Sequence, residues 1–277
     1  MSPDKPAENA PCEIANIHLQ ILGEQRCVPV AIPAGCQPIQ SLLPAARELT
    51  HQITRVAVEA VERQGRTVSC RAGCGACCRQ LVVISLTEAQ SLAEVVAAMP
   101  PERQAVIRQR FAEALRRLET TGLLDPNEPK GDRHLIQTGT DNAGTAVPPL
   151  AQRYFQQRIA CPFLEDESCG IYADRPLVCR EYLVTSPAED CAKLFELPVA
   201  RVEVPVHMGG VMVQLTHKVA GVPIEAIPLV LSLEWSEAHD GALQRKNDGL
   251  ELIQALVAEV ENEHRRTLPE LPQAAEG

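Results

Sequence analysis

Two groups of cysteines carry the spacing in this chain that is best suited to chemistry. The first group, Cys70, Cys74, Cys77 and Cys78, follows a C-x3-C-x2-C-C pattern with glycines at two of the intervening positions. Glycine permits positive φ and a close approach of the backbone, so a short loop of this kind can curl around a metal ion or cluster. This group therefore predicts a site that binds metal through thiolates.

The second group is more widely spaced and consists of Cys161, Cys169, Cys179 and Cys191, with gaps of seven, nine and eleven residues. Zinc ribbons and fingers usually offer paired, closely spaced cysteines, so these gaps disfavour a plain zinc ribbon. Iron-sulfur proteins often take three thiolates from one loop and a fourth from a distant segment. We therefore expect an iron-sulfur cluster, with 4Fe-4S favoured, and keep zinc as the alternative.

The eight cysteines are not expected to be equivalent. Adjacent residues of an extended chain point to opposite sides, so Cys77 and Cys78 should differ in their roles. We expect the two groups to meet at one metal site or at two neighbouring sites. Three further cysteines, Cys12, Cys27 and Cys36, lie outside the motifs and are interpreted as structural or incidental thiols. The seven histidines show no metal-binding spacing such as HxxxH.

Composition limits where the protein works and what it binds. Eleven cysteines in 277 residues are fewer than a secreted disulfide scaffold carries, and the N-terminus has no basic segment followed by an apolar one, so we expect a cytoplasmic protein with reduced thiols. A net charge of -10 argues against a nucleic-acid partner. No apolar run is long enough to predict a membrane span. A protein partner stays open.

The elements that must position the cysteines are mostly helical. Amphipathic spacing predicts a helix over residues 41–61, which leads into the first cysteine group. Behind that group comes LVVIS, and Thr87 with Gln90 after it has the form of a capping box that starts a helix. Pro100 and Pro101 should separate this helix from a second one, with which it forms a helical hairpin. The apolar stripe of the second helix is Val106, Ile107, Phe111, Ala114, Leu115 and Leu118.

The remaining segments are assigned by the same rules. Residues 17–23 and 27–33 suit a β-hairpin turning at 24–26, residues 123–148 a long loop, and residues 149–159 a short helix. Residues 201–219 suggest one or two strands, and residues 250–263 a helix. Residues 1–11 and the tail after Pro269 should be disordered.

The fold class is therefore α+β and predominantly helical, with a small N-terminal β-hairpin. We divide the chain into an N-terminal extension (1–40), a cysteine-cluster metal-binding domain (41–200) and a C-terminal strand and helix region (201–277) that packs on the same core.

CGACCR, CPFL and CGIYADRPLVCREY, together with their spacing, resemble the YkgJ-type cysteine-cluster family, which is named for a CxxCxxCC motif. The resemblance covers residues 70–191 and implies zinc or iron chelation, with Cys70, Cys74, Cys77, Cys78, Cys161, Cys169 and Cys179 as ligand candidates and Cys191 beside them. The present chain has three residues rather than two between the first two cysteines.

Two other classes stay open. Flagellin lysine methylases share this type of motif, so a cluster-dependent enzyme, either a methyltransferase or an oxidoreductase, is one alternative. A structural zinc module for protein interaction is the other. The C-x3-C-x2-C spacing also matches the cluster loop of radical S-adenosylmethionine enzymes, but no succession of alternating strands and helices supplies their barrel.

Overall fold

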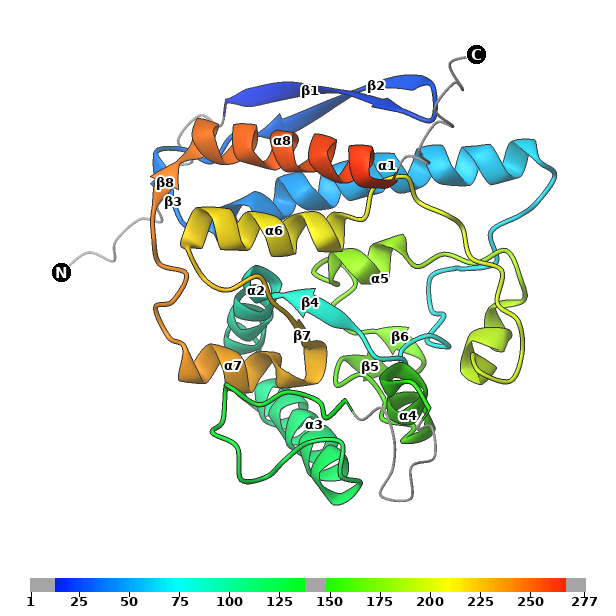
Figure 1. Ribbon diagram of the computed structural model, residues 1–277, viewed down its shortest axis with the longest axis vertical. Helices are drawn as coiled ribbons and strands as arrows, with labels where there is room; N and C mark the ends of the chain where they lie inside the picture. The colour runs from blue at the N-terminus through cyan, green and yellow to red at the C-terminus, as the bar shows by residue number, and fades with distance from the viewer. Residues whose placement is uncertain (1–12, 138–147, 268–277) are drawn as a thin grey trace, which may run out of the picture.

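The computed structural model describes residues 13–137 and 148–267. The disorder expected for residues 1–11 and for the tail after Pro269 lies outside these ranges, as does part of the loop expected over 123–148. Within them, helices predominate and strands occur in two-stranded antiparallel pairs, so the predicted helix-rich α+β class is confirmed (Figure 1). No helix of the described ranges combines the length and the apolar character needed to cross a bilayer.

The element bounds show how much of the chain is helical. The helices are α1 (Leu43–Arg63), α2 (Leu86–Ala97), α3 (Pro101–Thr120), α4 (Leu150–Gln156), α5 (Leu177–Glu181), α6 (Met208–Ala220), α7 (Ser232–Ala238) and α8 (Gly249–Thr267), with 3-10 turns η1 (Ile39–Leu42), η2 (Ala188–Lys193) and η3 (Leu229–Leu231). The strand pairs are β1 (Ile14–Ile21) with β2 (Glu24–Ala31), β3 (Cys36–Gln37) with β8 (Asn247–Asp248), β4 (Val83–Ser85) with β7 (Ala226–Pro228), and β5 (Leu164–Glu165) with β6 (Ser168–Cys169).

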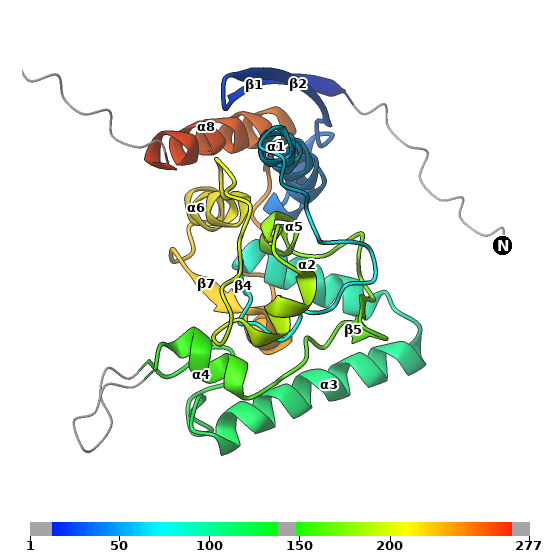
Figure 2. The same cartoon turned by 90° about the vertical axis from the view of Figure 1, so that its right-hand side faces the viewer.

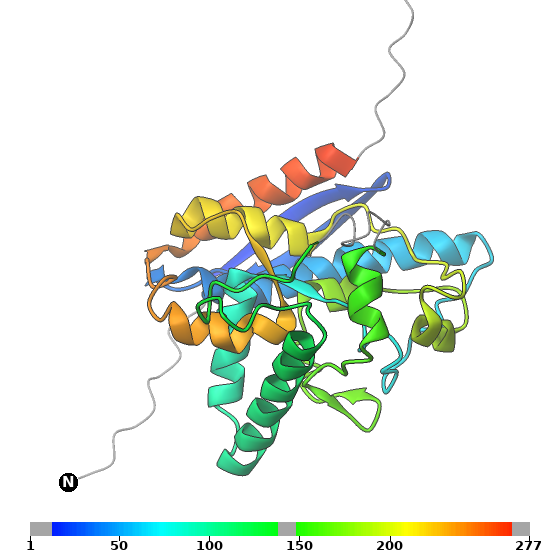
Figure 3. The ribbon, with the colours of Figure 1, turned by 60° about the horizontal axis from the view of Figure 1, so that its bottom comes forward.

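The elements are stacked in layers (Figures 1 and 2). The β1–β2 hairpin covers α1 and α8, and α6 lies beneath α8. The short helix α5 packs between α1 and α6, and α2 packs on α6 and α7. The helices α3 and α4 occupy the opposite end, which Figure 3 brings forward. One cluster of buried side chains extends from the hairpin through α1, α2 and α6 to α8.

The N-terminal hairpin is confirmed, but its predicted turn is wrong. Leu22 and Gly23 form the turn, with φ of 49° and 80°, and Glu24, Gln25 and Arg26 pair within β2. A two-residue hairpin turn of this kind needs positive φ at both positions, and its twist matches that of the strands. The missed signal was the glycine at the second turn position.

The helix after the first cysteine group is confirmed, but it starts earlier than the predicted capping box. Ser85 is the N-cap: its hydroxyl accepts from the Glu88 N–H, and the Glu88 carboxylate accepts from the Ser85 N–H. The helix therefore begins at Leu86. Thr87 lies inside it, where its buried hydroxyl is hydrogen-bonded to that of Thr216 at 2.7 Å. A Ser with Glu three residues later was the stronger start signal.

The strands predicted within residues 201–219 are wrong, because most of this segment is the helix α6. Its buried positions Met208, Val211, Met212 and Leu215 recur at three- and four-residue spacing, which is helical. Several β-branched valines had favoured strands. The helix ends at Gly221, whose φ of 74° is the left-handed conformation typical of a helix end.

A buried arginine fixes the segment between α3 and α4. Arg133, whose side chain is 3% exposed, donates to Glu119 of α3 and to Glu234 of α7. The described part of the segment predicted as a loop contains no helix, and a single antiparallel bridge joins Leu124 to Leu135. The ion pairs thus hold an irregular segment against two helices.

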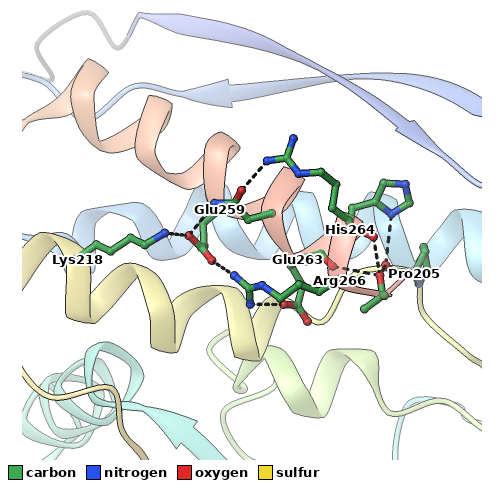
Figure 4. Close-up of polar contacts among 9 residues, drawn as sticks. Pro205, Lys218, Glu259, Glu263, His264 and Arg266 are labelled. Carbon is green, nitrogen blue, oxygen red and sulfur yellow. Dashed lines mark hydrogen bonds and ion pairs between the residues drawn. The ribbon is translucent and has the colours of Figure 1, made fainter. Parts of the chain in front are cut away.

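A buried carboxylate also joins the C-terminal helix to α6 (Figure 4). Lys218 of α6 and Arg266 of α8 both donate to Glu259, whose side chain is 1% exposed. At the end of α8, the Thr267 hydroxyl donates to the Pro205 carbonyl at 2.6 Å. These contacts tie α8 to α6 and to the chain that leads into α6.

The apolar stripe predicted for α3 is confirmed at four positions and wrong at one. Ile107, Phe111, Ala114 and Leu118 are buried, and Val106 is 46% exposed. The sixth predicted position, Leu115, is half-buried. Val106 falls off the stripe because three- and four-residue steps along a helix lead from Ile107, and not from Val106, to Phe111 and Ala114.

We expect Ile107→Ala to lower the free energy of unfolding by about 2–5 kcal/mol, because it leaves a cavity at a site with no exposure. Val106→Ala is the matched control on the same turn and should change it by less than about 1 kcal/mol. Urea denaturation of both variants measures the difference. Equal losses in the two would contradict this assignment of the buried face.

Candidate metal centre

The first cysteine group lies on an irregular loop that two glycines shape. Gly73 has a φ of 80°, the left-handed region that favours glycine. At Gly75, an added Cβ would lie 2.7 Å from the Glu167 carbonyl oxygen and 2.7 Å from Leu164 Cδ1. Only glycine therefore lets this loop pack against the turn that joins β5 to β6.

Direct bonds join the two cysteine groups. The Cys161 N–H donates to the Cys78 carbonyl at 2.7 Å. Next to it, Arg79 makes a two-pronged ion pair with Glu167, with nitrogen–oxygen distances of 2.5 and 3.0 Å. These bonds hold two segments that are far apart in the sequence side by side. Cys169 lies on β6, directly after the turn that contains Glu167.

The helix that carries Cys179 is held by carboxylates at both of its ends. Glu88 of α2 accepts from the Leu177 N–H at 2.8 Å and so caps the start of α5. At its end, Glu181 accepts from the N–H groups of Met208 and Gly209, which begin α6. A helix of five residues leaves most of its backbone groups without internal partners, so these bonds fix its position.

Cysteines of both groups surround one cavity of about 130 Å³. Its wall contains six of the eight predicted ligands: Cys74, Cys77, Cys78, Cys161, Cys169 and Cys179. Its wall is built by the first cysteine loop, the segment around the β5–β6 hairpin and α5. Figure 1 shows α5 near this hairpin. The structure therefore brings both groups to one place.

Cys70 and Cys191 lie beside the cavity and do not line it. Both interact electrostatically with Cys77, and Cys191 is buried, at 3% exposure. A polar chain leads to Cys191, because the Gln80 amide donates to the Tyr182 hydroxyl at 3.2 Å and this hydroxyl hydrogen-bonds the Cys191 thiol. The two cysteines form an outer layer on the side of Cys77.

The cysteines outside the motifs take no part in this arrangement. Cys27 and Cys36 are exposed free thiols, on β2 and β3, and Cys12 is outside the described residues. His207 lies beside Glu181, at 3.9 Å, and His134 pairs with Glu225 at 2.7 Å. No histidine is among the residues that line the cavity.

Burial favours the protonated form of Cys161 and Cys179 on the cavity wall. It raises the pKa of Cys161 to about 12, with part of the effect offset by the Phe163 backbone amide, and it raises the pKa of Cys179 well above its ordinary value. A hydrogen bond with Cys78, followed by burial, raises the pKa of Cys77 strongly. The thiolate form therefore requires positive charge at the cavity.

One source of positive charge is already present. Arg175 lines the cavity, lies with its guanidinium 4.4 Å from the Tyr172 ring centre, and lowers the pKa of Cys70, Cys77 and Cys169 against the larger effects that raise them. Its Nε–H is buried and has no acceptor among the described residues. A buried donor without an acceptor is costly, so it fits an anionic group in the cavity.

The cysteines of the cavity are of the right type to bind a metal as thiolates, but their present positions do not form a complete metal site. Among the residues of 13–137 and 148–267, no three Cys, His, Asp or Glu side chains are arranged to hold a metal ion. The shared site predicted for Cys70, Cys74 and Cys77 with a cysteine of the second group therefore requires movement of thiols toward the cavity.

Sequence reasoning missed the residues that place these thiols. Glu88 and Glu181 support α5, yet neither belongs to a recognisable metal-ligand pattern. The predicted capping box was Thr87 with Gln90, so the Ser85–Glu88 spacing was not used, and nothing local indicated that the second oxygen of Glu88 reaches Leu177. Glu181 stands two residues after Cys179, and its bond to the start of α6 spans chain far beyond that motif.

Comparison with known proteins supports the same chemistry. Residues 69–195 match the family model described as "CxxCxxCC: Putative zinc- or iron-chelating domain", which includes both cysteine groups. No curated protein and no solved structure matches the chain. The resemblance found in the cysteine motifs is thus confirmed over slightly less than half of the sequence.

Glu88→Ala should destabilise the protein by about 2–4 kcal/mol, because it leaves the buried donors of Ser85 and Leu177 without an acceptor. Glu94→Ala, at an exposed position of the same helix, is the control and should have little effect. Urea denaturation of the metal-free protein measures both. A loss no larger than that of the control would show that the cap on α5 is dispensable.

The metal-free protein should lose stability as pH rises. Burial raises the pKa of Cys161 to about 12 and that of Cys191 to about 11, whereas an unfolded chain titrates its thiols near pH 8.5. Above that pH the unfolded chain binds fewer protons than the folded one, so stability is fully present below about pH 8.5 and falls toward the folded pKa values.

We expect a loss of about 1 kcal/mol for each such thiol between pH 7.5 and 9.5. Urea denaturation under reducing conditions at both values measures it. Cys161→Ala should reduce the slope, and a stability that is flat over this range would contradict the neutral, buried state of the thiols.

Proposed function

Because residues 69–195 carry a CxxCxxCC domain, we propose that this chain binds metal through cysteine thiolates at the cavity between its two cysteine groups, with an iron-sulfur cluster preferred over zinc. The observation that carries the proposal is the cavity wall itself, which contains six cysteines drawn from both groups. Unligated structural thiols would not need a common cavity, since isolated thiols pack well as small apolar groups.

The size of the cavity supports a cluster over a single ion. A volume of about 130 Å³ exceeds the roughly 30 Å³ that one water molecule occupies in the liquid. Tetrahedral zinc draws four sulfurs to about 2.3 Å from one centre, while a cluster lets thiolates bind different irons around a larger core. Thiols spread around a cavity suit the second geometry, and 4Fe-4S is the type we favour.

Residues other than cysteine fit an anionic group. The Arg175 side chain offers a positive charge and a buried N–H without an acceptor among the described residues, and Gly73 of the loop also lines the cavity. A bound iron-sulfur cluster would supply one-electron transfer, whereas zinc would supply a structural crosslink. Arg175 would offset part of the negative charge of the thiolates in either case.

We assign the primary ligands to members of the six cysteines of the cavity wall, of which a 4Fe-4S cluster needs four, and place Cys70 and Cys191 in the outer layer beside Cys77. The metal-binding unit would then extend over residues 41–200, with 201–277 packing on the same core. All ten described cysteines are free thiols, which suits a reducing compartment such as the cytoplasm.

Anaerobic purification followed by metal analysis tests the metal directly. Iron and sulfide with absorption near 400 nm would support the cluster, and a colourless protein with stoichiometric zinc would replace it with zinc. Protein that holds neither metal after anaerobic reconstitution with each would refute the proposal.

Substitution separates ligands from other thiols. Cys74→Ser and Cys179→Ser should each reduce bound metal by at least half, because a site of this kind depends on each thiolate that binds directly. Cys27→Ser and Cys36→Ser, at exposed sites on β2 and β3, are the controls and should keep wild-type content. Metal content by mass spectrometry is the readout.

Cys77→Ser and Cys78→Ser should differ in the metal they retain, because adjacent side chains diverge. Stoichiometric metal in both Cys74→Ser and Cys179→Ser would leave the proposed site without support.

A further inference from the structure

A groove lined by arginines lies between α3 and the segment 158–164, at the end of the molecule that Figure 3 brings forward. Its volume is about 760 Å³, and its wall includes Arg110, Arg116, Arg117 and Arg158. The chain as a whole has a net charge of -10, so this cluster of positive charge is local and opposite in sign to the rest of the protein.

Three of these four arginines, Arg116, Arg117 and Arg158, differ from most others in lacking partners. Most arginines in the described ranges have an ion pair, a hydrogen bond or a ring contact of the side chain, as Arg79 has with Glu167 and Arg108 with Glu237. Five have no ion pair, hydrogen bond or ring contact of the side chain within those ranges. The five are Arg71, Arg116, Arg117, Arg158 and Arg245, and three of them line this groove.

The unpaired charge continues from the groove to the cysteine loop. Arg158 also lines a neighbouring hollow of about 490 Å³, whose wall includes Arg71 and Cys74. Cys161 lines the groove itself. Four of the five unpaired arginines therefore lie along one path that runs from α3 to the proposed metal centre.

Few acidic groups compete for this charge. In the groove, Glu113 accepts a hydrogen bond from Gln109 at 2.9 Å. Arg110 is already engaged, since it donates to the carbonyls of Pro162 and Leu164 and lies 3.8 Å from Glu165. In the neighbouring hollow, Glu167 is paired with Arg79, while Glu189 also lines the wall. Arg116, Arg117 and Arg158 thus stay available.

The position of Arg158 follows from the end of α4. Gln157 is the C-cap of this helix, and Arg158 after it has a φ of 52°, the left-handed conformation typical of a helix end. Arg158 is the one arginine shared by the walls of the groove and the neighbouring hollow.

We propose that this groove is a binding site for a small molecule that bears two or more carboxylate or phosphate groups. Guanidinium groups present parallel N–H donors that match both anions, and two neighbouring arginines on α3 with a third across the groove suit a ligand with more than one charge. The volume lies in the range of small-molecule sites, and the site goes beyond the proposed metal binding.

Calorimetric titration of the full chain with citrate and with tripolyphosphate tests the site and distinguishes the two anions. The protein is first treated with chelator and dialysed, so that neither probe acts by binding metal, and sodium chloride of equal ionic strength is the blank. We expect one molecule to bind per chain, with at least one of the two probes. The double variant Arg117→Gln/Arg158→Gln should weaken this binding at least tenfold.

A charge-matched control removes two arginines elsewhere, in Arg66→Gln/Arg245→Gln. Both are exposed, and Arg66 contacts only Gln64 while Arg245 is unpaired. This variant should bind as the wild type does. Thermal unfolding midpoints within a few degrees of wild type establish that both variants fold.

Three results would overturn the proposal: equal weakening in the two double variants, no binding of either probe beyond the chloride blank, or binding of hexaglutamate alone, which would indicate an acidic protein segment instead. Every measurement uses metal-free protein. A failure of the anion-binding proposal is therefore distinguishable from a failure of the metal-binding proposal.

Discussion

The free energy of charging a buried thiol is the constraint on which the rest of this structure depends. Cys161 and Cys179 are partly buried on the cavity wall, and burial raises the pKa of both. Without a cation, such thiols are held as neutral groups that pack like other small side chains. When a metal cation binds, the thiols that ligate it must lose their protons, so metal binding and proton release occur together. The Arg175 guanidinium lowers the pKa of Cys70, Cys77 and Cys169, and so lowers the free energy of charging these thiols.

Buried carboxylates hold the helix that carries Cys179. A short helix such as α5 has little internal hydrogen bonding, so the bonds made by the carboxylates at its two ends fix its position. Glu88 reaches α5 from α2, and Glu181 reaches from α5 to α6. Burial raises the pKa of both carboxyl groups, and the amides that they accept from offset part of that effect. The position of Cys179 is therefore tied to two larger helices.

Sequence patterns predicted the parts of this fold that depend on nearby residues. The periodicity of α1, α3 and α8 and the pairing of β1 with β2 follow from neighbours along the chain, and these elements are confirmed. The helix α6 was missed because its valines favour strands locally, whereas packing on α8 and α2 selects the helix. The turn at Leu22 and Gly23 was misplaced because the dipeptide is a weaker signal than the polar residues after it.

For the candidate site, sequence spacing identified the cysteines, and six of the eight line one cavity. It did not separate those six from Cys70 and Cys191, because that distinction depends on how α5 and the first cysteine loop pack. Nor did it predict that Arg158 would face the groove with Arg116 and Arg117, since these residues are brought together only by the packing of α3 against the segment after α4.

The bond from the Cys161 N–H to the Cys78 carbonyl has a consequence for how the protein is made. The chain between these residues contains α2, α3 and α4, so closing this contact costs the entropy of a long loop, and it belongs to the slow, nonlocal stage of folding. During synthesis, the first cysteine group leaves the ribosome well before the second group exists. A nascent chain therefore exposes four crowded thiols without their partners, and insertion of a metal into the complete centre follows translation of the second group.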